Sequence, residues 1–290
     1  MHVRMRSRVP KDKVAEWKGH HPEKDHYDLV VTGNIDLYGP GNKPVIIVRR
    51  GGLSQERVDE ARPVLHAMKS LTTDNRGNYA GGKRVLKVKQ DGTMSKVSRA
   101  KTVRSAMAGY IEKQGGRFPF CREAAYNQHN PLGWAVIQPV LRDVATLYRD
   151  TMPEKYAAQM KHVNATHPAW VIDGTPFTTI TVNNTVPAAY HQDAGDLRDG
   201  FGVMFVLRDG DYRGYELVIP EYRVAVDLHD GDVIFFDPTV WHGNVPPYDT
   251  EGEELVDYNR ISVVCYYREG IKGCLSPAAE LEKAKARGAL

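Results

Sequence analysis

The sequence is poor in cysteine and has none of the long apolar segments that direct export or membrane insertion. Its 290 residues include three cysteines, and an odd number without a C-x-x-C pair argues against a disulfide framework or a structural zinc site. The amino-terminal residues are charged and polar, without the apolar core of a secretion signal. No apolar run approaches the ~20 residues that span a bilayer. We therefore expect no membrane association and a reducing cytoplasm.

Internal repeats, low-complexity tracts and a strong net charge are also missing. The formal net charge is +3 and 26% of residues are charged, which is ordinary for a globular protein. The charge is uneven, however, because residues 83–104 contain a single acid, Asp91, among many basic side chains. Such a segment can follow a phosphate backbone, although a solvated hairpin is the alternative. The basic residues are Lys83, Arg84, Lys87, Lys89, Lys96, Arg99, Lys101 and Arg104.

Apolar stripes at helical spacing predict helices in the first half of the chain. One helix is expected over 54–71, capped by Ser54 and kinked at Pro63. A second is expected over 132–150. Thr151 and Glu154 have the spacing of a capping box and predict the start of a third helix.

The remaining parts of this half, and the carboxyl end, give weaker signals. We expect short strands over 27–32 and 44–49, separated by a turn. Residues 1–27 are predicted as a solvated tail, 105–114 as a short helix or turn, and 277–290 as a charged helix or tail.

From residue 169 onward the pattern changes to short β segments punctuated by Asp-Gly turns. Many short strands preceded by long helices predict an α+β protein with a double-layered jelly roll, the double-stranded β-helix, backed by helices. We expect one domain over 1–270 and a tail over 271–290. Within the domain, strands, helices and the basic segment over 1–120 pack on the core, and helices and the jelly-roll catalytic core follow over 121–270. The predicted strands are Trp170–Asp173, Phe177–Asn183, Gly202–Leu207, Glu216–Ile219, Val224–Asp227, Val233–Phe236 and Ile261–Arg268.

Within the predicted roll, His191 and Asp193 are two residues apart, so in a strand both side chains point to the same face. A third potential ligand, His242, follows in the stretch Trp241-His-Gly-Asn244. A bare His-x-Asp is a weak signal in a chain with 11 histidines. The ordered set of three in a β context is stronger, because two histidines and one carboxylate form the facial triad of non-haem Fe(II) oxygenases.

Arg260 and Ser262 lie on one face of a later predicted strand. A guanidinium pairs with a carboxylate in a bidentate fork, so this pair suits a dicarboxylate co-substrate such as 2-oxoglutarate. A plain metal-binding cupin needs no such anchor, which argues against a non-enzymatic binding module.

These stretches resemble the 2-oxoglutarate/Fe(II) dioxygenases, and within them the TET/JBP branch that oxidises the methyl group of 5-methylpyrimidines in DNA. The resemblance runs from about residue 28 to 270 and is densest over 177–268, and small phage- or microbe-type members look nearest. Its landmarks are Asn75-Arg-Gly77, Cys121-Arg122, His191-Gln-Asp193, Gly214–Tyr222 with Val226–Asp232, Trp241–Asn244 and Arg260-Ile-Ser262.

The resemblance implies a role for each matching position. Fe(II) would be held by His191, Asp193 and His242, with one position left for O2. Arg260 and Ser262 would bind the distal carboxylate of 2-oxoglutarate. Two further residues are candidates on the co-substrate side: Asn183, and Arg122 with a structural ion pair as its alternative.

The resemblance also implies contacts to DNA. Asp196 stands where relatives place an asparagine or aspartate against the target base, with a surface turn as the alternative. Arg268 stands near a base-contacting histidine of relatives. The basic segment would contact phosphates through Lys87, Lys89, Arg99 and Arg104. A duplex methyl group lies outside the reach of a buried metal, so base flipping is expected.

The implied reaction is hydroxylation of 5-methylcytosine in DNA to 5-hydroxymethylcytosine, with further oxidation left open. Thymine in DNA and an amino acid or other small molecule remain alternative substrates for the same chemistry. The cytoplasm of a bacterial or phage-infected cell is the expected location, and no obligate protein partner is evident.

Overall fold

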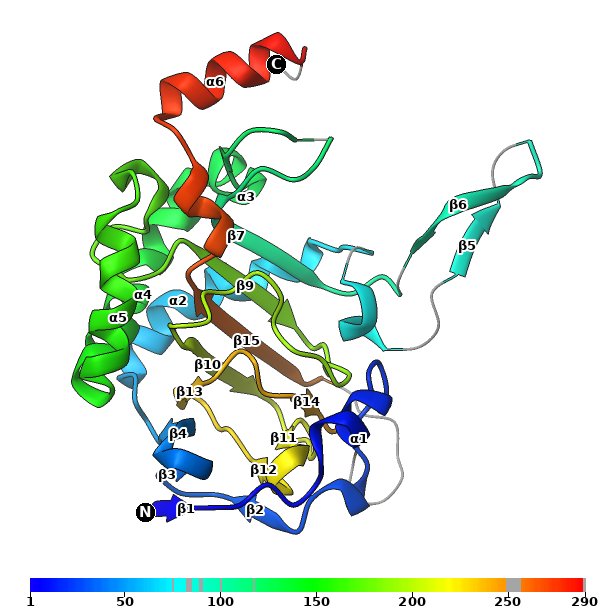
Figure 1. Cartoon of the computed structure of the whole chain (residues 1–290), viewed down its shortest axis with the longest axis vertical. Helices are drawn as coiled ribbons and strands as arrows, with labels where there is room; N and C mark the ends of the chain where they lie inside the picture. Colours follow the sequence, from blue (N-terminus) through cyan, green and yellow to red (C-terminus); the bar gives the residue numbers. More distant parts are fainter. Residues whose placement is uncertain are drawn as a thin grey trace.

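The computed structural model describes residues 1–74, 76–81, 85–88, 91–99, 101–116, 118–248 and 257–288. Within them, a nine-stranded sheet and a four-stranded sheet form two layers, and helices cover the outer face of the large sheet (Figure 1). This is the expected α+β jelly roll backed by helices.

The large sheet contains strands from both ends of the chain. Its pairings are antiparallel except for β1 with β3. The order is β1 (His2–Arg4), β3 (Ile35–Tyr38), β4 (Pro44–Arg49), β13 (Val233–Phe236), β10 (Gly202–Asp209), β15 (Asn259–Tyr266), β9 (Thr179–Asn184), β7 (Ser105–Ile111) and β8 (Arg122–Glu123).

The small sheet lies over the other face and closes the roll. Its order is β14 (Gly243–Asn244), β11 (Leu217–Ile219), β12 (Val224–Val226) and β2 (Leu29–Val31). A separate hairpin of β5 (Val85–Val88) and β6 (Met94–Arg99) projects away from the body (Figure 1).

Alternation along β10 shows how the layers are held together. Successive side chains of a strand point to opposite faces, so Val203 and Phe205 pack against the helices while Met204 and Val206 pack against the small sheet. All four side chains are buried. The helices are α2 (Gln55–Ala67), α4 (Pro131–Thr151) and α5 (Pro153–Asn164).

The structure corrects three predictions of local structure. Residues 105–111 form β7 rather than a helix or turn, and pair with β9. Helix α4 continues through Thr151, and α5 starts after Met152 without a side-chain cap, so no capping box forms. Residues 170–173 are not a strand, because Pro168 opens the 3₁₀ turn η5 (Pro168–Trp170).

The amino-terminal residues are packed against the roll and are not a solvated tail. β1 pairs with β3, and the short helix α1 (Lys11–Glu16) buries Val14 completely among residues of the small sheet and of the loop before His191. Trp17 stacks on His26 with ring centres 4.0 Å apart. These contacts dock a segment whose overall polarity suggests a free tail.

The prediction that the cysteines form no disulfide is also wrong. Cys121 and Cys274 are bonded, with Cα atoms 5.7 Å apart, and Cys265 is free and buried. The two cysteines are 153 residues apart in the sequence, so only the fold reveals that they meet. The bond joins the residue before β8 to the segment before α6 (Pro277–Ala286).

None of the helices in the described part of the chain is both long and apolar enough to cross a bilayer.

A buried carboxylate holds the turn that precedes β13. Asp232 accepts hydrogen bonds from the backbone of Gly51 at 2.9 Å and of His229 at 2.6 Å, and it pairs with the guanidinium of Arg50. Its side chain is 3% exposed. Removing one partner of a buried pair leaves an uncompensated charge.

We therefore predict that Asp232→Ala lowers the free energy of unfolding by about 3 kcal/mol in urea titrations. The matched control is Asp36→Ala, which removes the carboxylate of the more exposed Arg49–Asp36 pair and should cost less than about 1 kcal/mol. Equal losses in both variants would contradict this assignment.

Candidate metal centre and cavity

Two distant segments of the chain meet at the candidate metal centre. His191 and His242 form an isolated antiparallel bridge in which each backbone N–H donates to the carbonyl of the other at 3.0 Å. Asp193 follows on the same segment, and its N–H donates to the carbonyl of Pro238 at 3.1 Å. The backbone therefore fixes all three residues relative to one another.

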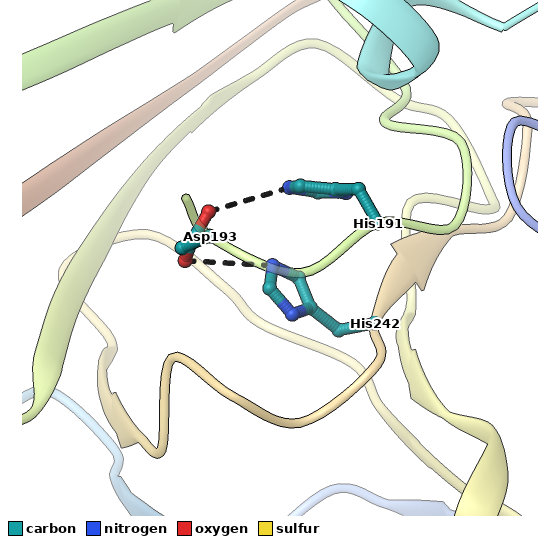
Figure 2. A group of neighbouring side chains, drawn as sticks. All are labelled: His191, Asp193 and His242. Carbon is teal, nitrogen blue, oxygen red and sulfur yellow. Dashed lines mark ion pairs between the residues drawn. The ribbon is translucent and has the colours of Figure 1, made fainter. Parts of the chain in front are cut away.

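The three side chains converge on one point (Figure 2). Nε2 of His191 lies 3.5 Å from Oδ1 of Asp193, and Nε2 of His242 lies 3.8 Å from Oδ2. One ligand atom from each residue lies within 4.8 Å of the others. This arrangement matches the pattern predicted from the sequence.

The same kind of local hydrogen bond orients both imidazole rings. Nδ1 of His191 lies 2.8 Å from the carbonyl oxygen of Ala189, and Nδ1 of His242 lies 2.9 Å from that of Val240. A carbonyl only accepts, so each Nδ1 carries the proton and donates. Each Nε2 therefore presents a lone pair to the centre, as a metal ligand requires.

Charge and burial at the centre also fit a cation. Oδ2 of Asp193 is buried without a hydrogen-bond partner in the described structure. Burial works to raise the pKa of Asp193, but His242 and His191 outweigh it and the net pKa is lowered. Burial, with His191 nearby, lowers the pKa of His242 to about 4. A neutral imidazole and an ionised carboxylate are the forms that bind a divalent metal.

The centre opens into a cavity of about 620 Å³ inside the roll. Ser262, Val264 and Tyr266 of β15 line it from one face of the strand, as period-two alternation requires. Its other walls are Lys18, Arg76, Tyr79, Thr181, Asn183, Ala188, His191, Gln192, Asp193, Ala194, Asp196, Arg198, Met204, Leu217, Phe236, Trp241, His242, Asn244 and Arg268.

Arg260 lies on the same face of β15 as Ser262, but it is not one of the residues that line the cavity. The residue is 3% exposed, and its guanidinium carbon is 5.0 Å from the ring centre of Tyr215. Within the described residues its Nη2 has no hydrogen-bond partner and no carboxylate lies within ion-pair distance. Burial lowers its pKa. A buried cation without a counter-ion fits a site for an anionic ligand.

Asn183 lines the cavity as predicted, and it belongs to a chain of hydrogen bonds. Its Oδ1 accepts from the hydroxyl of Ser105 at 2.6 Å, and that hydroxyl accepts from Nε of Arg76 at 3.0 Å. Arg76 was not among the predicted site residues, although the landmark Asn75-Arg-Gly77 contains it.

Tyr79 is a second site residue that sequence reasoning missed. Its ring meets the ring of His191 edge-on with centres 4.7 Å apart, and its carbonyl accepts from the N–H of Ala189 at 2.9 Å. Burial raises its pKa to about 12, while Arg76, Arg260 and Asp193 are all within electrostatic reach. Tyr79 therefore contacts the triad and is electrostatically coupled to the buried guanidinium.

Asp196 and Arg268 both line the cavity and face each other in an isolated bridge. The guanidinium of Arg268 is held by Glu112 through two nitrogens. Burial and the nearby Asp193 raise the pKa of Asp196 well above its usual value. Of the two predicted base contacts, Arg268 is held by Glu112, so Asp196 is the more available to a ligand.

The structure does not bring Arg122 to this site. Its Nη2 donates to Oε1 of Gln114 at 2.8 Å, and its guanidinium carbon lies 4.1 Å from the ring centre of Phe118. Arg122 is opposite Ile111 at one end of β7, whereas Asn183 is opposite Ser105 at the other end. The predicted contact to the co-substrate is therefore wrong, because a whole strand separates the two positions.

The predicted phosphate contacts are only partly described. The side chains of Lys87 and Arg99, and all of Lys89, lie outside the described residues. Arg104 is exposed, and its carbonyl accepts from the N–H of Asn184 at 2.9 Å.

The double-layered roll and its site of two histidines and one carboxylate define a non-haem Fe(II) oxygenase of the 2-oxoglutarate-dependent class. The model of the Tet/JBP family, described as the oxygenase domain of the 2OGFeDO superfamily, matches residues 106–269, more than half of the chain. The chain belongs to this family. Membership implies Fe(II), 2-oxoglutarate and O2 as cofactors, and the residues of the site fit them.

Curated relatives include thymine dioxygenases of Trypanosoma and Leishmania species. The chain is 33% identical to thymine dioxygenase JBP1-B of Trypanosoma cruzi (strain CL Brener) over 185 residues, which are 63% of this chain and 21% of the relative. It is 28% identical to the bifunctional helicase and thymine dioxygenase JBP2 of Leishmania infantum over 280 residues, 94% of this chain and 22% of the relative. The chain thus spans about a fifth of the length of these relatives.

A solved structure shares the fold across the whole chain. NgTET1 in complex with 5mC DNA superimposes with a TM-score of 0.60 at 13% identity, covering 95% of this chain and 99% of that one. At this identity the likeness shows the fold.

Metal binding provides a direct test of the triad. A ligand that binds only the folded state raises the midpoint of thermal unfolding. We predict that Fe(II), or Co(II) as an air-stable substitute, stabilises the native protein and that Asp193→Ala abolishes this stabilisation. Asp196→Ala, which removes a cavity carboxylate three residues away, should retain it. If metal stabilises Asp193→Ala as well as the native protein, the triad is not the metal site.

Proposed function

We propose that this protein is an Fe(II)- and 2-oxoglutarate-dependent dioxygenase that hydroxylates the methyl group of a 5-methylpyrimidine in DNA. The observation that carries the proposal is the pairing of a preformed triad at the cavity with the buried guanidinium of Arg260. Nη2 of Arg260 has no hydrogen-bond partner among the described residues, and Arg260 is two residues before Ser262, which lines the cavity. Such a triad and guanidinium suit a ligand that chelates metal at one end and has a carboxylate at the other.

Each group has a defined task in this proposal. His191 and His242 would hold the metal through Nε2, and Asp193 through its carboxylate. Bound there, Fe(II) with 2-oxoglutarate supplies the activation of O2 and the oxidising power for hydroxylation. Arg260 would pair with the distal carboxylate, with the hydroxyl of Ser262 beside it. The buried walls exclude water from the reacting atoms.

The base must enter the cavity for its methyl group to approach the metal. In a duplex that methyl group lies in the major groove, so the nucleotide is flipped out or presented in a single strand. Asp196 lines the cavity three residues from Asp193. Its carboxyl oxygens can accept the N3 hydrogen of thymine or the N4 amino hydrogens of 5-methylcytosine.

The relatives support thymine as the first candidate base. They are thymine dioxygenases at 28 to 33% identity, whereas the likeness to NgTET1 concerns the fold alone. 5-Methylcytosine, the base expected from the sequence, stays the second candidate. Asp196 fits both.

The test is mass spectrometry of nucleosides after incubation with unmodified DNA and with DNA containing 5-methylcytosine. We expect hydroxymethyluracil from the first if thymine is the substrate, and hydroxymethylcytosine from the second alone if 5-methylcytosine is. His191→Ala is the control and should give neither. If 2-oxoglutarate is turned over at the same rate with and without either DNA, the protein is a small-molecule hydroxylase. If 2-oxoglutarate is not turned over at all, the protein is a binding module.

The role of Arg260 gives a second prediction with two readouts. Arg260→Met should raise the KM for 2-oxoglutarate by roughly 10- to 100-fold, because hydrogen bonds to a charged group contribute about 1.5–3 kcal/mol. The apo variant should be no less stable than the native protein in urea, since the lost cation has no internal counter-ion. Ser262→Ala should raise KM by about 10-fold or less. A large loss of apo stability in Arg260→Met would instead assign Arg260 to the core.

A further inference from the structure

Four basic side chains line the cavity, and two of them are engaged inside the protein. Arg76 donates to Ser105, and Arg268 pairs with Glu112. The other two, Lys18 and Arg198, are exposed and have neither a hydrogen bond nor an ion pair with any part of the chain that the structure describes. These two cations are free to meet a ligand from outside.

Lys18 is held at the mouth by the amino-terminal arm, which we define as residues 10–26. The backbone N–H of Gly19 donates to the carbonyl of Tyr190 at 3.0 Å, and the N–H of Tyr190 donates to the carbonyl of His20 at 2.8 Å. Lys18 therefore projects from a fixed backbone beside the segment that carries His191.

Arg198 comes from a different wall, the loop that follows the metal-binding segment. Its neighbour Leu197 is buried, and the N–H of Leu197 donates to the carbonyl of Tyr267 at 3.0 Å. The N–H of Glu269 donates to the carbonyl of Gly195 at 2.8 Å. The loop is therefore anchored on both sides of Asp196, and Arg198 stands at its outer end.

Nearby surface acids have basic side chains of their own as neighbours. Glu16 pairs with Lys13 at 2.7 Å, and Asp199 lies 3.7 Å from Nε2 of His162. Of the acids inside the cavity, Asp193 belongs to the triad, and Asp196 lies opposite Arg268 in a backbone bridge.

We propose that Lys18 and Arg198 bind the two phosphates that flank the nucleotide inserted into the cavity. This inference rests on the proposed function and assigns the strand contacts at its site. A phosphate is too costly to desolvate inside the roll, so the backbone on either side of an inserted base stays at the rim. Two free cations on separate walls suit a continuous strand, which has one phosphate on each side of the base.

The experiment measures binding of single-stranded oligonucleotides by fluorescence anisotropy, with the iron-loaded protein and without O2. Lys18→Met and Arg198→Met remove one charge each from exposed positions. Each variant should bind more weakly, and the slope of log K against log salt should become shallower by about 1, as for the loss of one phosphate contact. Matched controls are Lys161→Met and Arg149→Met, exposed charges on the outer helices α5 and α4.

Oligonucleotides with one neutral methylphosphonate identify which phosphate each cation meets. When the methylphosphonate replaces the phosphate that the substituted cation binds, the variant should bind that oligonucleotide as well as the native protein does. When the methylphosphonate replaces the phosphate on the other side of the inserted nucleotide, the variant should still bind that oligonucleotide more weakly than the native protein does. This crossed pattern is not produced by a general loss of positive charge.

The inference is overturned if the native protein does not bind the oligonucleotides, or if the variants match the two controls. It is equally overturned if a neutralised phosphate leaves the effect of both substitutions unchanged, or if an acidic peptide competes as well as DNA does. Failure of the proposed oxidation is separate, because binding is measured without turnover. Oxidation of DNA that persists unaltered in both variants would remove this inference and leave the proposed function standing.

Discussion

The site depends on one short backbone bridge, between His191 and His242. Its two hydrogen bonds join segments that are far apart in the sequence and set the spacing of the metal ligands before any metal arrives. Each imidazole is then aimed by a carbonyl two residues earlier in its own segment. Because these restraints come from the backbone, the ligand geometry tolerates variation in the surrounding side chains and is preorganised for a cation.

Two charged groups near the cavity are incompletely satisfied, and they have opposite signs. Oδ2 of Asp193 has no hydrogen-bond donor, and Nη2 of Arg260 has no acceptor, among the described residues. Leaving such groups buried costs free energy, which a bound metal at one end and a bound carboxylate at the other would recover. Tyr79 interacts electrostatically with both charges. The cavity is therefore complementary to a ligand with two different ends, and a uniformly apolar ligand would satisfy neither.

The sequence predicts the metal ligands well because their information is local. Period-two spacing places His191 and Asp193 on one face, and a β context surrounds His242. The parts of the fold that were not predicted correctly carry no local signal in the sequence. β7 consists mostly of small residues. Gly109 within it has a φ of 94°, and a side chain there would come within 2.6 Å of the carbonyl oxygen of Thr178. Its pairing with β9 on one side and β8 on the other makes this segment a strand.

The same reasoning explains why the walls of the cavity were harder to predict than its centre. The matched family segment begins at residue 106, whereas Lys18, Arg76 and Tyr79 come from before it. These outer pieces contact each other: Gly81 has a φ of 71°, and a side chain there would come within 2.7 Å of Nε2 of His21. The segment before residue 106 thus packs on itself as it closes the wall beside His191. Chemistry and access are therefore encoded in different parts of the chain. A motif can identify the chemistry, but only the packed structure identifies the residues that a substrate meets on its way in.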